Sequence, residues 1–163
     1  MRSTLERQRA AFDRAGSPSL SQRKDKLRRL RAALQRHKAR LASAISDDFG
    51  GRSRNESLLV DVLGSVLAID HALRNLRRWM APRRRRAELL FLTNRVWVEY
   101  QPKGVVGIIA PWNFPVYLTL GPLATALAAG NRAMIKMSEL TPATTAAVRA
   151  LLAECFDDDE VAV

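Results

Sequence analysis

Two apolar runs, each ending in polar residues, constrain the fold of this chain more than any other feature. Residues 105–110 read Val-Val-Gly-Ile-Ile-Ala and lead into Pro-Trp-Asn-Phe-Pro at 111–115. Residues 133–135 read Ala-Met-Ile and lead into Lys-Met-Ser-Glu at 136–139. Between them lies a stretch of small and apolar residues, closed by Gly130, with the length of a crossover helix. The pattern therefore predicts a strand, a helix and a second, parallel strand.

The residues that follow the two strands are candidates for a ligand site. Ligands of open α/β sheets bind just beyond the carboxyl ends of the parallel strands. Asn113 follows the first strand, and Lys136 and Glu139 follow the second, so we expect all three at one edge of the sheet. The first strand is apolar at successive positions, which is typical of a strand buried on both faces inside a parallel sheet.

The part of the chain before the strands is predicted to be helical. Residues 2–15 form a short helix, and Ser17 and Pro18 supply the N-cap and first position of a long one. That helix ends at the glycines of residues 47–51, and a third helix is expected over residues 55–80. Apolar residues recur at intervals of three, four and seven in both long helices, so each has a face to bury.

The remaining segments are less regular. Residues 83–86 are four arginines, which we interpret as a solvated connector because no aromatic residues are interleaved for nucleic-acid contact. Residues 95–101 alternate as in a strand with at least one partly covered face. Thr141 and Pro142 open another helix, and residues 161–163 begin a third strand, where the sequence reads as cut.

These elements predict an α/β fold with long N-terminal helices followed by the start of a doubly wound, Rossmann-like parallel sheet. The corresponding domains are a helical region at 1–94, a connecting strand at 95–103, and the start of an incomplete α/β domain at 104–163.

Composition limits the class of protein. The chain has 163 residues, 47% of them hydrophobic and 26% charged, as in a globular domain. No apolar stretch is long enough to cross a bilayer, and the N-terminus shows no secretory signal. The single cysteine excludes an internal disulfide, which predicts a cytoplasmic location.

The net charge of +11 is unevenly distributed. Residues 1–103 carry 24 basic and 10 acidic residues, whereas residues 104–163 carry 3 and 6. A basic front half is typical either of a surface for nucleic acid or another acidic partner, or of ordinary solvated helix faces. We favour the second interpretation and keep a basic nucleic-acid-binding module as an alternative.

The motif at 104–115, Gly-Val-Val-Gly-Ile-Ile-Ala-Pro-Trp-Asn-Phe-Pro, resembles the signature of the NAD(P)-dependent aldehyde dehydrogenase superfamily. Residues 121–131 and 135–142 continue the resemblance in register. Residues 48–56 and 98–102 resemble most closely the coniferyl aldehyde dehydrogenase branch, close to the short class 3 enzymes. The resemblance spans nearly the whole chain and implies its N-terminal place in such an enzyme.

The resemblance implies oxidation of an aldehyde, including aromatic, coniferyl-type aldehydes, to a carboxylic acid. It assigns a catalytic role to Asn113, whose amide would hold the oxyanion. A fixed neutral donor suits that role, because losing such a donor typically costs about 3 kcal/mol. The proline-flanked loop is a rigid mount for it.

The resemblance also implies a dinucleotide site. Lys136 and Glu139 match residues that bond the adenine-side ribose hydroxyls, and a carboxylate there disfavours a 2′-phosphate, so NAD is expected with NADP still possible. Methionine at 137 replaces the proline of many relatives, which predicts a less rigid mount and a lower affinity. The assigned cofactor contacts are Ile109, Ala110, Pro111, Trp112, Asn113, Lys136, Ser138 and Glu139.

The family's nucleophilic cysteine and general-base glutamate are expected further along the chain than this sequence extends. Cys155 lies in an apolar helical pattern without a cationic partner, so we interpret it as a core residue. His37 and His71 show no metal-ligand spacing, and no metal site is predicted. The resemblance suggests a possible homodimer. We also consider a chain inactive alone: a truncated remnant or an interaction subunit.

Overall fold

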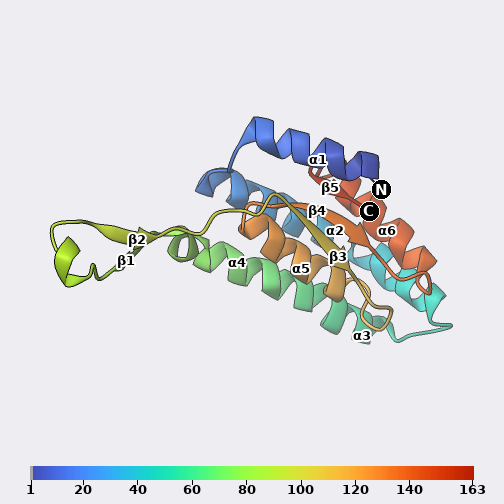
Figure 1. Cartoon of the computed structure of the whole chain (residues 1–163). Helices are drawn as coiled ribbons and strands as arrows, with labels where there is room; N and C mark the ends of the chain where they lie inside the picture. The colour runs from blue at the N-terminus through green and yellow to red at the C-terminus, as the bar shows by residue number, and fades with distance from the viewer. Residues whose placement is uncertain (1) are drawn as a thin grey trace.

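The computed structural model describes residues 2–163. Long helices come first along the chain, and a parallel sheet with its crossover helices follows (Figure 1). No helix within these residues is long and apolar enough to span a membrane. The elements are, in order, α1 (Arg2–Ala15), α2 (Leu20–Asp48), α3 (Arg54–Glu56), η1 (Ser57–Leu63), α4 (Gly64–Met80), β1 (Arg83–Arg85), η2 (Leu89–Phe91), β2 (Val96–Val98), β3 (Val105–Ile109), α5 (Tyr117–Ala128), β4 (Arg132–Lys136), α6 (Pro142–Ala153) and β5 (Val161–Ala162).

The start of α2 differs from the sequence prediction by two residues. The N-cap is Ser19, whose hydroxyl accepts from the amide of Gln22 while the Gln22 side chain accepts from the amide of Ser19. This reciprocal pair satisfies two donors that a cap at Ser17 would leave open. Ser17 instead accepts a hydrogen bond from Arg23. The predicted cap at Ser17 was therefore wrong.

The helix predicted over residues 55–80 is present, but it contains an irregular turn. The short α3 continues into η1, a π-helical segment, and then into α4. A π-helical turn widens the hydrogen-bond ladder and is frequent at functional sites. Here the widened turn includes the buried Asp61.

The arginine run is exposed, as expected of a solvated connector, but its first three residues form a strand. Strand β1 pairs antiparallel with β2, with Arg84 opposite Trp97, and the hairpin projects from the body of the molecule (Figure 1). All residues of both strands are exposed, so the prediction of a partly covered face for residues 95–101 was wrong. A two-stranded ribbon has no layer of its own to cover it.

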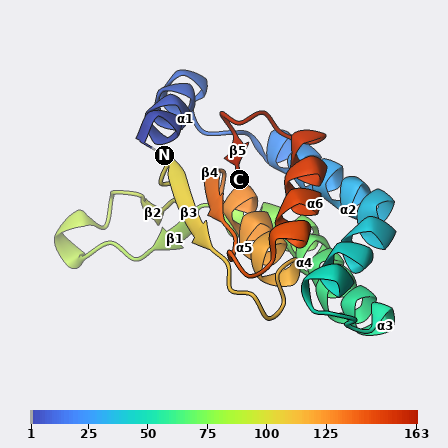
Figure 2. The ribbon, with the colours of Figure 1, turned by 90° about the vertical axis from the view of Figure 1, so that its right-hand side faces the viewer.

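The sheet of the α/β part has the predicted parallel topology. Its order is β3-β4-β5, and the two crossover helices α5 and α6 lie on one face, with α1 near the opposite face (Figure 2). Strand β3 is an edge strand, and α1 covers its face opposite α5 only in part, leaving Ile109 83% exposed. The prediction that this strand is interior and buried on both faces is therefore wrong for residues 2–163.

One hydrophobic core joins the helical and α/β parts. It includes Leu34 and Ile45 of α2, Ile69 of α4, Leu120 of α5 and Val148 of α6. These side chains come from both sides of the domain boundaries expected from the sequence. The division at 94 and 103 stays a prediction.

Gly130 supports a stability prediction at the junction of α5 and β4. Its φ is +86°, and a Cβ atom there would lie 2.7 Å from Cζ of Arg23, which donates to the carbonyl of Ala128. We expect Gly130→Ala to lower the free energy of unfolding by about 2 kcal/mol, from the left-handed backbone and the clash. Urea denaturation measures this change.

Gly107→Ala is the matched control for this prediction. Gly107 has no positive φ, and no atom lies within 4 Å of the position that a Cβ atom would take there. An equal loss in both variants would contradict the explanation.

Candidate functional site

The carboxyl ends of β3 and β4 meet at one edge of the sheet, as the strand pattern predicted. Ile109 pairs in register with Lys136, and the amide of Ala110 donates to the carbonyl of Lys136 at 2.9 Å. Asn113 follows three residues after Ala110. The two sequence motifs, separated by a helix in the chain, are therefore neighbours in the structure.

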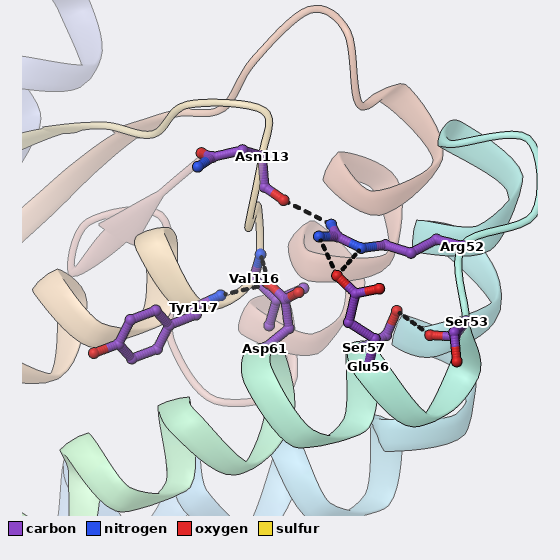
Figure 3. A network of polar contacts seen from close by, with 8 residues as sticks. All are labelled: Arg52, Ser53, Glu56, Ser57, Asp61, Asn113, Val116 and Tyr117. Atoms are coloured by element: carbon purple, nitrogen blue, oxygen red, sulfur yellow. Dashed lines mark hydrogen bonds and ion pairs between the residues drawn. The ribbon is translucent and has the colours of Figure 1, made fainter.

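The loop Pro111–Pro115 carries Asn113 on the surface. Its first three residues are exposed, and Phe114 and Pro115 turn the chain back into the protein. Figure 3 shows the Asn113 carbonyl directed towards Arg52, which donates to it at 2.6 Å, while the side-chain amide points away. Within residues 2–163 that side-chain amide makes no hydrogen bond, so its two N–H donors remain available.

The end of this loop is held by Asp61 (Figure 3). Its Oδ1 accepts from the amides of Val116 and Tyr117, both at 3.0 Å, and so caps the first turn of α5. The carboxyl is fully buried, and Oδ2 has no partner. Burial raises the pKa of Asp61, although the two backbone donors partly oppose the shift.

The last residue of β4 and the residues that follow it make contacts with one another. Lys136 Nζ and Glu139 Oε1 lie 2.5 Å apart, and both side chains are exposed. The hydrogen bond from Lys136 lowers the pKa of Glu139. Met137 is buried in the core, so apolar packing anchors the segment between Lys136 and Glu139. The Ser138 hydroxyl accepts from the amide of Leu140.

A groove of about 490 Å³ runs along the open face of β3 and β4 beside α1. Ile109 and Lys136 line one end of it. Ala110 is buried, whereas Pro111 and Trp112 are exposed beyond the strand. The residues assigned to the cofactor thus present apolar surface from β3 and a charged pair formed by the last residue of β4 and Glu139.

Cys155 is separated from this edge. It follows α6, which returns from the carboxyl ends of the strands to their amino ends. Its thiol is buried, and burial raises its pKa. The interpretation of Cys155 as a core residue is confirmed, because the residue belongs to the hydrophobic cluster. The expectation that it lacks a cationic partner was wrong, because the charges of Arg36 and Arg29 partly oppose the effect of burial on its pKa.

Three residues that build this site, Asp48, Arg52 and Asp61, have no role that the sequence motifs predict. Asp48 accepts from the amides of Ala143 and Thr144 and caps α6, although it lies at the end of α2. For Asp61 the available signal was an acidic residue within the apolar run at 58–63. Within residues 2–163, no cluster of three or more potential metal ligands occurs.

Known sequences are similar to this chain over its whole length. The profile described as "Aldehyde dehydrogenase family" matches residues 1–162. A probable coniferyl aldehyde dehydrogenase of Caulobacter vibrioides is 47% identical over 100% of this chain and 34% of its own length. The coniferyl aldehyde dehydrogenase of a Pseudomonas species is 44% identical over 98% of this chain and 33% of its own. This chain therefore spans about a third of the relatives' length.

Solved structures of aldehyde dehydrogenases are also similar to this chain over nearly its whole length. Substrate-bound AldH of Staphylococcus aureus has a TM-score of 0.94 at 28% identity, over 99% of this chain and 35% of its own. AldA, an indole-3-acetaldehyde dehydrogenase of P. syringae solved with NAD+, scores 0.82 at 25% identity over 97% and 32%. Succinic semialdehyde dehydrogenase of Streptococcus pyogenes, solved with NADP+, scores 0.85 at 19% over 98% and 34%, which supports the fold alone.

These findings define an α/β chain with a parallel sheet and a candidate site at the carboxyl ends of two of its strands. The chain belongs to the aldehyde dehydrogenase family.

Proposed function

We propose that this chain is the N-terminal part of an enzyme that oxidises aldehydes, including aromatic, coniferyl-type aldehydes, to carboxylic acids. The observation that carries this proposal is the meeting of two strand ends, one followed by the unpaired amide of Asn113 and the other by Lys136 and Glu139. The coniferyl-type substrate rests on the relatives that match over the whole chain.

The residues at this edge fit a bound dinucleotide. The ammonium of Lys136 and the carboxylate of Glu139 offer a donor and an acceptor to a ribose diol, and the exposed Ile109 offers an apolar surface to a ring. NAD or NADP supplies the hydride acceptor when bound. A carboxylate beside the ribose disfavours a 2′-phosphate, so we propose NAD as the preferred form.

The role proposed for Asn113 is to stabilise negative charge on the aldehyde oxygen. When a nucleophile adds to the carbonyl carbon, this oxygen becomes an oxyanion, and an amide N–H directed at it lowers the energy of that state. The 163-residue chain is not expected to catalyse this reaction alone, because its one thiol is buried and remote from Asn113.

Binding of NAD to the isolated chain tests the cofactor part of the proposal. Lys136→Ala is expected to weaken binding by about tenfold or more, as for the loss of one charged hydrogen bond. Glu139→Gln is expected to raise the affinity for NADP relative to NAD, because it removes the charge that repels a 2′-phosphate. Isothermal titration calorimetry with both cofactors measures the two effects.

Lys38→Ala is the control for Lys136→Ala, because Lys38 is an exposed lysine on α2 and the charge change is the same. Equal weakening by both substitutions would reduce the effect to net charge and overturn the proposed contact. DNA binding that falls steeply with salt would instead favour the basic nucleic-acid-binding module.

The remaining expectations concern the whole protein. The homodimer, the cytoplasmic location and the truncated remnant or interaction subunit stay predictions. NAD binding by the isolated chain would separate a cofactor-binding unit from an inert remnant.

A further inference from the structure

Arg52 lies beneath the Asn113 loop with nearly all of its side chain enclosed. Its side chain is 12% exposed, and its guanidinium lies 4.6 Å from the ring centre of Phe49 and 4.8 Å from that of Phe114. Nη1 donates to the carbonyl of Asn113, while Nε and Nη2 donate to Glu56 at 3.2 and 2.9 Å. The two rings and Glu56 thus hold the planar donor group in one orientation.

These contacts restrict the loop at Asn113, the residue proposed to stabilise the oxyanion. A guanidinium hydrogen bond to a carbonyl is charge-assisted and stronger than a neutral one. Holding the Asn113 carbonyl restricts rotation of the peptide plane that follows Asn113. The direction of its side chain then depends on the same restraint, and Figure 3 shows the side-chain amide leaving on the opposite side.

We propose that Arg52 is a positioning residue that orients the side-chain amide of Asn113 by holding its carbonyl. This inference rests on the proposed oxyanion role of Asn113. A donor prepared in advance loses little free energy to reorganisation when charge develops. Asp61 holds the following residues Val116 and Tyr117, so Arg52 supplies the restraint at Asn113 itself.

A simple surface ion pair does not explain this arrangement. Arg52 and Glu56 are four residues apart, and exposed pairs of this spacing contribute little to stability. Such a pair requires neither two flanking rings nor a third acceptor in another element. The contacts to Phe114 and to the Asn113 carbonyl come from a loop 61 residues away from Arg52.

The test uses NMR relaxation of the 163-residue chain without ligand. In the wild type, we expect order parameters of about 0.85 for the backbone amides of Asn113 and Phe114, typical of a rigid backbone. Arg52→Ala is expected to reduce them below about 0.6. The Val116 and Tyr117 amides should remain protected from hydrogen exchange, because Asp61 still accepts from both. This retained protection would show that α5 is folded in the variant.

Two further variants separate positioning from folding or charge. Arg52→Lys keeps the charge but loses the planar fork, so its loop should be as mobile as that of Arg52→Ala. If Arg52→Ala does not fold, Arg52→Lys takes its place in the test. Arg54→Ala removes an exposed arginine two residues away and should leave the order parameters unchanged. Millimolar guanidinium should restore loop order in Arg52→Ala, whereas equal sodium chloride should not.

A second readout follows the Asn113 side-chain resonances during titration with NAD. In the wild type NAD should shift them. In Arg52→Ala the shift should be lost, while the affinity changes by no more than about twofold because Lys136 and Glu139 are separate from the restraint.

Unchanged order parameters in Arg52→Ala and Arg52→Lys would overturn the proposal, as would an unaltered NAD-induced shift. If the wild type does not bind NAD but the loop loses order in Arg52→Ala, the cofactor proposal fails and the restraint by Arg52 stands.

Discussion

Asp61→Ala is expected to lower the free energy of unfolding by about 3 kcal/mol, because two hydrogen bonds to a carboxylate and a helix cap are lost together. The amides of Val116 and Tyr117 would then lack their acceptor where the loop enters α5. Far-ultraviolet circular dichroism during urea unfolding measures the change. A loss no larger than that of an exposed substitution would show that Asp61 does not hold this junction.

Asp61→Asn separates the hydrogen bonds from the charge. Its side-chain oxygen still accepts from both amides, so we expect a smaller loss than in Asp61→Ala. Burial raises the pKa of Asp61 in the folded chain, so ionisation destabilises that chain relative to the unfolded one.

The stability of the wild type relative to Asp61→Asn should therefore fall as the pH rises from about 3.9, the ordinary aspartate pKa, through the raised folded pKa. Urea unfolding of both proteins across this range gives the difference. A relative stability that rises with pH would contradict the raised pKa.

Leu34→Ala is expected to lower the free energy of unfolding by about 3–5 kcal/mol, the range for removing a fully buried leucine. Leu34 lies on α2 with no exposed surface and belongs to the core shared by α2, α4, α5 and α6. The substitution removes apolar burial and leaves a cavity that the helices fill only in part. Urea unfolding followed at α-helical wavelengths measures it.

Leu59→Ala is the matched control, because Leu59 is 64% exposed in η1. We expect a change within about 0.5 kcal/mol, as for most surface substitutions. Tryptophan fluorescence should give the same shift in the urea midpoint as circular dichroism. If Leu34→Ala lowered the midpoint measured by circular dichroism but not the midpoint measured by fluorescence, the core would not be one cooperative unit.

Local patterns predicted the regular elements well. The apolar runs of β3 and β4, the crossover between them, the helix opened at Pro142 and the strand at Val161 are all present. They could be predicted because side-chain periodicity, proline and glycine act within a few residues. The cap of α2 was misplaced because Ser17 and Ser19 are both suitable caps, and only Ser19 has Gln22 three residues later.

The candidate site was predictable only in part. The motifs identified Asn113, Lys136 and Glu139, and the parallel pairing of β3 with β4 explains why they share an edge. Arg52 and Asp61 were not assigned, because their partners lie 61 and 55 residues away in the chain. No local periodicity specifies such pairs.

The order of amino acids alone was sufficient for the parallel strands, their crossover helix and the family motif, because each depends on short-range spacing and on residue type. Three-dimensional packing was needed to show which buried carboxylate caps α5 and which guanidinium holds the Asn113 carbonyl. The same packing left Ile109 exposed on an edge strand and made β1 and β2 a projecting ribbon. The physical reason is that burial and hydrogen-bond partners depend on neighbours in space, whereas secondary-structure preference depends on neighbours in the chain.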